Sequence, residues 1–254
     1  MNINEPSVSI IMATYNSEKF LRETLDSICC QTYGNWELII TDDSSTDNTS
    51  DILRDYSERY NNIFYSINEV NQGAAISRNK CISQAKGMYI AFIDSDDLWA
   101  HNKLEKHIHF IAEHNSAISF TSYELMNENG IPLGKYVDAN IPPVLTYNDM
   151  LRKKATIGCS TVILSSKLVG EFKMPLLRTG QDYATWLLLL KKVEVAHHFP
   201  KVLTKYRVCK NSISRNKFKK AKRQWQIYRE VEKLPFYESI VCFCFYAWRA
   251  VFRK

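Results

Sequence analysis

Three carboxylates stand close together in the segment MYIAFIDSDDLW at 88–99, at positions Asp94, Asp96 and Asp97. Acids this close repel one another, and their pKa values rise unless a cation neutralises them. Carboxylate oxygen atoms favour a hard divalent ion such as Mg²⁺ or Mn²⁺. The spacing therefore predicts a metal site able to hold a nucleotide diphosphate. Capping of the next helix is the alternative interpretation for Asp97, because Asp is common at helix starts.

Polar residues also follow two earlier apolar runs, VSIIMA and WELIIT. They are Thr14, Tyr15 and Asn16 after the first run, and Asp42 and Asp43 after the second. Because ligands of parallel sheets bind outside the carboxyl ends of the strands, we expect these residues to share a crevice with the acid cluster. There Tyr15 could stack on a base and Asp43 could accept its N–H. Packing and helix capping are the alternatives, but recurrence at three strand ends favours binding.

A further acid, Asp182, lies in the segment LRTGQDYATWLLLL at 177–190. It falls in the first turn of an apolar helix, where the helix dipole favours a carboxylate, so a purely structural role would explain it. His197 and His198 are adjacent and near a strand. Neighbouring residues of a strand point to opposite faces, which favours surface or packing roles over metal binding.

The elements that position these residues alternate between strands and helices. The run at 89–93 is continuously apolar, which is typical of a parallel strand covered on both faces. The predicted strands are 8–13, 36–41, 63–67, 89–93, 117–126, 160–165 and 202–208, and the predicted helices include 18–30, 47–59, 73–85 and 103–114. This order predicts an α/β protein with a Rossmann-like, mostly parallel sheet and flanking helices.

Composition limits the class of protein. A hydrophobic share of 45% and a charged share of 24% are those of a globular chain. The seven Cys are scattered without a C-x-x-C spacing, which argues against a disulfide framework and a zinc site. The N-terminal residues MNINEPS lack the pattern of a signal peptide, so we expect a cytoplasmic protein.

The C-terminal residues 210–254 differ from the rest in charge. They carry 12 Lys and Arg against three Glu, whereas residues 1–209 are mildly acidic. The pattern predicts a basic amphipathic helix, a break at Pro235 and a second, mostly apolar helix. The uninterrupted apolar run 240–248 is far shorter than the ~20 residues that span a bilayer. We expect these helices to lie on a membrane surface, and docking on the protein body or a second subunit is the alternative.

Four segments together resemble the motifs of family 2 inverting glycosyltransferases with the GT-A fold. These are VSIIMATYN, WELIITDDSSTDNT, NQGAAISRNKCISQAKGMYIAFIDSDD and TGQDYATWLLLL, and the resemblance covers nearly all of residues 7–208. It implies a UDP-sugar donor, with Asp43 and Tyr15 near uracil and Arg78 near the nucleotide. It also implies Asp94 and Asp96 as the DxD pair around Mn²⁺ or Mg²⁺. Whether Asp96 or Asp97 is the direct metal ligand stays open.

The resemblance also implies roles outside the acid cluster. Asp182 becomes the catalytic base, with Gln181 in place of the commoner Glu, and Arg207 and Ser214 become candidate phosphate contacts. Thr14 and Asp42 complete the expected donor site. Ala13 departs from relatives that carry Thr or Pro there, and we expect little consequence. Residues 1–209 would form the catalytic domain, with a nucleotide-binding half at 1–100 and an acceptor-binding half at 101–209, and residues 210–254 would associate with the membrane.

The expected enzyme transfers a hexose, glucose or galactose, from a UDP-sugar to a polyprenyl-diphosphate-linked sugar. The acceptor typical of such relatives is GlcNAc- or GalNAc-diphospho-undecaprenol in O-antigen or capsule assembly, and the new bond is a β-linkage. We expect the reaction to take place at the inner face of the cell membrane. The enzyme could act as an oligomer. A sugar nucleotidyltransferase is an alternative, but it needs a Gly-rich basic loop after the first strand, and ATYNSEKF is not one. A nucleic-acid-binding protein using the basic tail would leave the acids unexplained, so no nucleic acid partner is expected.

Overall fold

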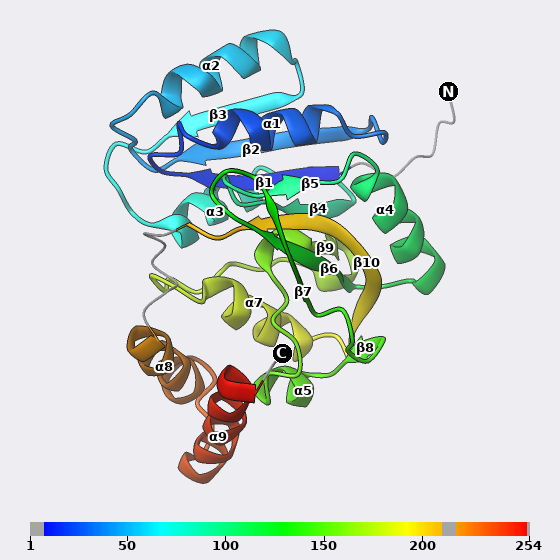
Figure 1. Cartoon of the computed structure of the whole chain (residues 1–254), viewed down its shortest axis with the longest axis vertical. Helices are drawn as coiled ribbons and strands as arrows, with labels where there is room; N and C mark the ends of the chain where they lie inside the picture. The colour runs from blue at the N-terminus through cyan, green and yellow to red at the C-terminus, as the bar shows by residue number, and fades with distance from the viewer. Residues whose placement is uncertain (1–7, 210–216, 253–254) are drawn as a thin grey trace.

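The computed structural model describes residues 8–209 and 217–252. At its centre is a ten-stranded sheet with the order β3-β2-β1-β4-β9-β6-β10-β5, while β7 pairs with β6 and β8 with β10 (Figure 1). The strands are β1 Val8–Thr14, β2 Trp36–Asp42, β3 Ile63–Ile67, β4 Tyr89–Phe92, β5 Leu98–Trp99, β6 Ile118–Met126, β7 Pro132–Val137, β8 Val144–Leu145, β9 Val162–Ser165 and β10 Ala196–Arg207.

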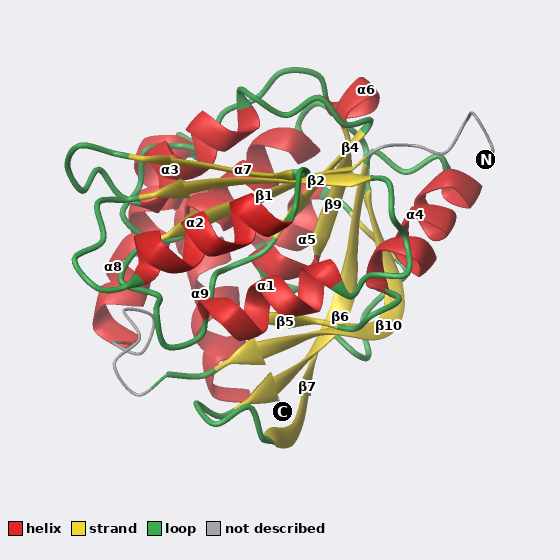
Figure 2. Ribbon diagram, turned by 90° about the horizontal axis from the view of Figure 1, so that it is seen from above, coloured by secondary structure: helices red, strands yellow, loops and turns green. Residues whose placement is uncertain are grey.

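Helices connect these strands and cover the sheet. They are α1 Leu21–Cys29, α2 Thr49–Arg59, α3 Ala74–Ile82, α4 Lys103–His114, α5 Tyr147–Leu151, the 3₁₀ turn η1 Cys159–Thr161, α6 Ser166–Val169, α7 Gln181–Leu190, α8 Lys217–Gln226, the π-helical turn η3 Ile227–Val231 and α9 Phe236–Phe252. Figure 2 shows α1 and α2 on one face of the sheet and α3 and α7 on the other.

The first half of the sheet is parallel, as predicted. Strand β1 pairs in parallel with β2 and β4, and β2 pairs in parallel with β3. Alternate residues of β1 enter two apolar cores, since Ile10 and Met12 pack toward α1 and α2 whereas Ile11 packs on the side of α7. The continuous apolar runs are therefore explained by burial on both faces.

The second half of the sheet is mixed. Strand β9 is antiparallel to both β4 and β6, and β6 is parallel to β10. Strand β10 begins at Ala196 instead of the predicted residue 202, because its pairing with β6 continues across irregularities between Phe199 and Thr204. The sequence did not predict β7, whose residues are mostly exposed and show no apolar alternation.

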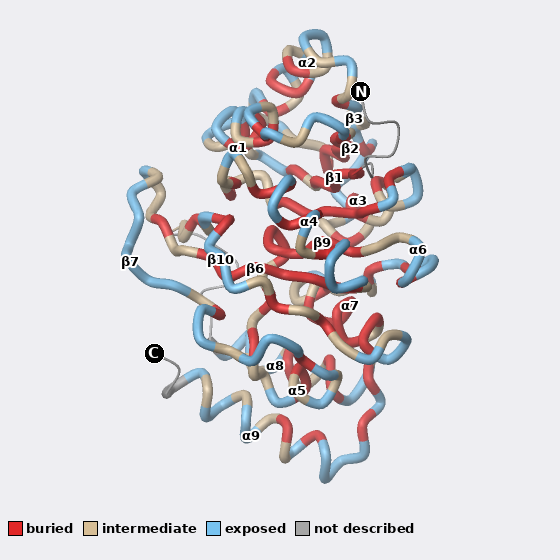
Figure 3. Tube along the Cα trace, turned by 90° about the vertical axis from the view of Figure 1, so that its right-hand side faces the viewer, coloured by how far each residue is buried: buried red, intermediate tan, exposed pale blue. Residues whose placement is uncertain are grey.

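The C-terminal helices contact the body through η3 and leave part of α9 uncovered. Ile227 and Tyr228 belong to the same buried core as Trp186 of α7. Much of α9 is exposed in Figure 3. Tyr237 and Trp248 are among its exposed residues. Within residues 8–209 and 217–252, no helix has both the length and the apolar character needed to cross a bilayer.

Candidate functional site

The turns after β1 and β2 lie side by side. Thr14 and Asp42 are aligned in the sheet, and the Thr14 hydroxyl donates to Asp42 at 2.8 Å. The other Asp42 oxygen accepts from the backbone N–H of Ser45 at 3.0 Å. Asn16 adopts a φ of +47° and its side chain accepts from Thr46 N at 2.8 Å. Both Thr14 and Asp42 are buried, so their observed role is to join the two turns.

Asp43 and Tyr15 lie differently at this edge. The Asp43 carboxylate is buried and accepts hydrogen bonds from the Asn68 amide and the N–H groups of Gln72 and Gly73, at 2.8, 2.9 and 2.6 Å. Burial alone would raise the pKa of Asp43, but these hydrogen bonds lower it. The Ser77 hydroxyl also lowers this pKa, so four protein groups surround a carboxylate that has about four acceptor positions. Tyr15 is 50% exposed, which leaves its ring free to stack.

Arg78 of α3 connects two of the predicted site acids. Its Nη2 donates to Asp94 Oδ1 at 2.5 Å. Burial would lower the pKa of Arg78, but the neighbouring Cys159, Asp94 and Asp182 together raise it. The Nε and Nη1 atoms are buried and have no hydrogen-bond partner among the described residues. The structure thus brings Arg78 together with Asp94 and Asp182 and leaves two cationic N–H donors for an anion.

Asp96 and Asp97 have different surroundings although they are adjacent. Asp97 is fully buried and accepts from the Ser160 hydroxyl at 2.5 Å and from Arg207 N at 2.9 Å. Burial, followed by the charges of Asp96 and Asp94, raises its pKa well above the usual range. Asp96 is only partly buried, and burial with the charge of Asp94 raises its pKa to about 6.

The three acids do not converge on one point. No group of three or more His, Cys, Asp or Glu side chains suited to a metal ion is found within residues 8–209 and 217–252. Asp97 is turned toward Ser160, and Asp94 pairs with Arg78. Asp96 is the remaining acid of the turn. Mg²⁺ is commonly bound by one or two carboxylates plus substrate phosphates, so Asp96 and Asp94 fit a cation shared with a diphosphate better than a cage of three acids.

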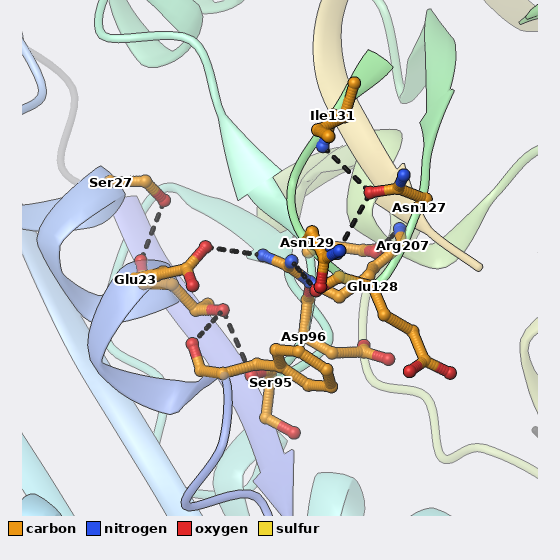
Figure 4. A network of polar contacts seen from close by, with 12 residues as sticks. Glu23, Ser27, Ser95, Asp96, Asn127, Glu128, Asn129, Ile131 and Arg207 are labelled. Carbon is orange, nitrogen blue, oxygen red and sulfur yellow. Dashed lines mark hydrogen bonds and ion pairs between the residues drawn. The ribbon is translucent and has the colours of Figure 1, made fainter. Parts of the chain in front are cut away.

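Arg207 is placed inside the protein, not as an open phosphate contact. Its side chain is fully buried and donates to the carbonyl oxygens of Asp96 and Glu128 and to the carboxylate of Glu23, at 2.8, 2.9 and 2.7 Å (Figure 4). These bonds hold the turn at Asp96 between α1 and the loop after β6. The other predicted phosphate contact, Ser214, lies outside the described residues.

Asp182 lies in the first turn of α7, as predicted. Gly180 precedes the helix in a left-handed conformation with φ +72°. The Asp182 side chain is partly exposed, and no hydrogen bond from another described residue occupies its carboxylate. A carboxylate in this state can accept a proton from a bound hydroxyl group.

Ser160 is a site residue that the sequence did not indicate. Its hydroxyl accepts from Asp94 N at 3.0 Å and donates to Asp97, and its carbonyl accepts from the Trp99 indole at 2.8 Å. It therefore fixes both ends of the acid turn. A Ser at the start of an apolar strand carries no distinctive sequence signal, which is why it was missed.

His197 and His198 have packing roles, as predicted. The His197 ring is hydrogen bonded to the Ser116 hydroxyl at 2.9 Å, and the His198 ring to the Ser122 hydroxyl at 3.0 Å.

A pocket with a volume of about 520 Å³ lies between α1, β5 and β10 and is lined by Glu23 among others. None of the residues predicted to bind the donor lines that pocket.

Comparison with known proteins gives the family. The sequence matches the model of glycosyl transferase family 2 over residues 9–167. It is 45% identical over 250 residues to the putative teichuronic acid biosynthesis glycosyltransferase TuaG of Bacillus subtilis (strain 168), covering 98% of each chain. It is 40% identical over 229 residues to WfgD of Escherichia coli, named a UDP-Glc:alpha-D-GlcNAc-diphosphoundecaprenol beta-1,3-glucosyltransferase, covering 90% of this chain and 87% of WfgD.

A solved structure agrees with this result. S. aureus TarS 1-349 in complex with UDP superposes with a TM-score of 0.67 and 26% identity, over 80% of this chain and 60% of that one. The shared architecture is a mixed sheet with helices on both faces, as expected of the GT-A fold. Together with the match to the family model, this shows that the chain is a glycosyltransferase with the GT-A fold and belongs to glycosyl transferase family 2.

Proposed function

We propose that this enzyme transfers a hexose, with glucose as the first choice and galactose as the second, from its UDP derivative to GlcNAc- or GalNAc-diphospho-undecaprenol. The observation that carries the proposal is Arg78, which is ion-paired with Asp94, interacts with the charge of Asp182 and has two buried nitrogen donors, Nε and Nη1, unused. That arrangement provides a cationic site for a diphosphate beside a free carboxylate. The 40% identity to WfgD over most of both chains supports the lipid-linked acceptor.

The donor would lie along the carboxyl ends of β1, β2 and β4. The half-exposed Tyr15 ring would stack on uracil, and the Asp43 carboxylate, held ionised by its hydrogen bonds, would lie near the base. The free Nε–H and Nη1–H groups of Arg78 would donate to phosphate oxygens, because a guanidinium is suited to such contacts. Thr14 and Asp42 support this site by joining the two turns.

Asp96 and Asp94 would hold Mn²⁺ or Mg²⁺ together with the diphosphate. The fit rests on their chemistry, since the donors are oxygen atoms, and a positive charge would offset the burial and the charge of Asp94 that together raise the pKa of Asp96. When bound, such an ion stabilises the negative charge of the departing UDP. Asp97 would act indirectly, by fixing the turn through Ser160 and Arg207.

Asp182 would be the general base of a single displacement. The acceptor hydroxyl oxygen attacks the anomeric carbon from the face opposite UDP, and its proton passes to the Asp182 carboxylate. The bond from the anomeric carbon to the β-phosphate oxygen breaks, and its electron pair leaves with UDP. Inversion at the anomeric carbon follows, and a donor with an α-linked sugar would give a β-linked product.

The C-terminal helices would bring the enzyme to the inner face of the membrane that holds the acceptor. On α9, Ile240, Val241, Cys244, Phe245 and Trp248 line an apolar groove of about 410 Å³. The neighbouring α8 is rich in Lys and Arg. An apolar face beside basic residues is the pattern of a helix that lies in the interface of an anionic membrane.

A donor and acceptor screen tests the proposal. UDP-glucose, UDP-galactose and UDP-GlcNAc would each be combined with short-chain GlcNAc- and GalNAc-diphospho lipids, and the product linkage would be read by NMR. We expect one UDP-hexose to be used, with a β-linkage to the N-acetylhexosamine. No transfer from any of the three donors to either diphospho lipid, or an α-linked product from an α-linked donor, would overturn it.

A further inference from the structure

The C-terminal segment contacts the start of α7, two residues before Asp182. A Cβ atom added at Gly180 would lie 3.1 Å from Ile227 Cδ1 and 3.7 Å from Arg223 Cγ. Gly180 also has a φ of +72°, which side-chain-bearing residues rarely adopt. The Ile227 side chain is buried and therefore occupies the space beside the first turn of α7.

A second contact joins the same two segments through α5. The Tyr228 hydroxyl donates to the Leu151 carbonyl at 2.6 Å, and the Tyr183 hydroxyl donates to the Met150 carbonyl at 2.9 Å. Both tyrosines are buried. The last carbonyls of a helix lack partners within it, so one residue of η3 and one of α7 satisfy adjacent carbonyls at the end of α5.

A third contact holds the far end of α7. Glu232 follows η3, its side chain is 2% exposed, and it accepts from Lys191 Nζ at 2.6 Å and from the Tyr147 hydroxyl at 2.5 Å. Lys191 is the C-terminal cap of α7. A buried carboxylate is stable only when it is paired and hydrogen bonded, so these bonds are costly to lose.

The π-helical turn η3 brings these contacts to one segment of the chain. Glu232 N donates to Ile227 O at 2.9 Å, a spacing of five residues, which places Ile227 and Glu232 one wide turn apart. Such turns are rare in proteins and occur often at functional sites. One short segment thus contacts α7 at its start through Ile227 and at its end through Glu232.

We propose that Ile227, Tyr228 and Glu232 are positioning residues for Asp182. The inference rests on the proposed role of Asp182 as the base. The Asp182 carboxylate has no hydrogen-bond partner among the described residues, so its direction is set by where α7 begins. The C-terminal segment is accordingly part of the catalytic unit as well as a membrane contact. A displacement of the Asp182 carboxylate by about 1 Å can lower the rate of transfer about 100-fold.

Substitution of Ile227 tests this role. Ile227→Ala removes the contact with Gly180 and should lower kcat about 10- to 100-fold on a water-soluble acceptor, while calorimetry shows unchanged UDP affinity. Phe218→Ala is the matched control, because Phe218 lies on α8 but is 90% exposed. Thermal unfolding curves should show that both variants are still folded at the assay temperature. Unchanged kcat in Ile227→Ala would overturn the proposal, as would equal loss of kcat and UDP affinity.

A double-mutant cycle makes the test independent of overall stability. Gly180→Ala places a methyl group against Ile227 Cδ1 and should lower kcat, and Ile227→Val removes that atom. Their combination should restore part of the kcat lost in Gly180→Ala, and strictly additive losses would contradict the contact. Asp182→Asn in the same assay separates the hypothesis that Asp182 is the base from the hypothesis that Ile227, Tyr228 and Glu232 position it. If it retains turnover, the base assignment fails whatever the cycle shows, and if it does not, the cycle alone decides the positioning role.

Discussion

The adjacent carboxylates of Asp96 and Asp97 in the acid turn have different surroundings, because one is partly exposed and the other is fully buried. Asp97 is enclosed and bonded to Ser160 and Arg207, while Asp96 is partly exposed and its carbonyl, not its carboxylate, is bonded to Arg207. The sequence presents them as equivalent neighbours. Only the direction of each side chain, set by the turn that Arg207 holds, distinguishes the proposed metal ligand Asp96 from the structural acid Asp97.

This distinction predicts opposite outcomes for two substitutions. Asp96→Ala should abolish metal-dependent UDP-sugar binding and turnover with little change in thermal stability, since the side chain is partly exposed. Asp97→Ala should destabilise the fold by about 1–3 kcal/mol because it leaves the buried Ser160 and Arg207 donors without an acceptor. Mn²⁺ titrations of UDP binding and thermal unfolding measure the two effects. Full activity in Asp96→Ala, or of the wild type in excess EDTA, would refute the metal assignment.

The proposed base has its own test at residue scale. Asp182→Asn keeps the shape of the side chain but cannot take a proton, so kcat should fall by about 10²–10⁴ while donor affinity persists. Calorimetry with UDP-glucose and single-turnover assays separate binding from chemistry. Equal losses of donor affinity and rate would make Asp182 a structural residue, and a product that retains the donor's configuration would exclude a single displacement.

Among the elements, α4 carries a buried lysine for which residues 8–209 and 217–252 provide no carboxylate partner. Lys103 is fully buried, its Nζ lies 3.4 Å from the Thr161 carbonyl, and burial lowers its pKa to about 7. An unfolded chain keeps this proton up to about pH 10.5. Between these two values the unfolded state binds more protons, so the free energy of unfolding rises with pH.

Lys103→Met should therefore stabilise the protein at pH 7, by at least about 1 kcal/mol or about 2–4 °C in Tm. The difference from the wild type should shrink as the pH rises from 7 toward 10.5, because the free energy needed to remove the proton from Lys103 on folding falls with pH and vanishes once the unfolded state also loses that proton. Tm measured at pH 7, 8 and 9 tests this, with the exposed Lys106→Met on the same helix as the control. A constant difference across this range would contradict the role assigned to burial.

The elements that the sequence predicted are those with strong apolar periodicity. Strand β3 matches its predicted range, and α4 does too. The elements that were missed depend on tertiary contacts: β7 is mostly exposed and pairs with β6, and the first part of β10 crosses Pro200 on an irregular register. In the same way, the motifs indicated the site acids, but the bonds of Ser160 and Arg207 depend on segments far apart in sequence.

Over the whole molecule, the basic C-terminal segment has two parts with different neighbours. The turn η3 belongs to the main core, whereas α9 contributes Cys242 to that core but lies at the end of the molecule remote from α2 (Figure 1) and exposes Tyr237 and Trp248. Trp225 of α8 packs against Phe236 and Phe243 of α9, which joins the two parts. The charge asymmetry seen in the sequence therefore does not mark a simple detachable tail.

Two truncations should separate these parts. Deleting 235–254 removes the exposed face of α9 but keeps η3, so the protein should leave anionic vesicles and act poorly on a long polyprenyl substrate, yet still bind UDP-sugar and use a short water-soluble acceptor. Deleting 217–254 also removes Ile227, Tyr228 and Glu232, so turnover of the short acceptor should fall as well. Vesicle co-sedimentation, calorimetry with UDP and turnover of both acceptors distinguish the outcomes.

Trp248→Ser is the matched point variant for the shorter truncation, because Trp248 is 63% exposed and its loss leaves the core intact. It should weaken vesicle binding without changing kcat on the short acceptor. If the 235–254 deletion loses donor binding, α9 is part of the packed fold and the membrane interpretation fails. If it keeps donor binding but still sediments with vesicles, the basic residues of α8 hold the surface, and sedimentation should then decline with added salt because exposed charges are screened.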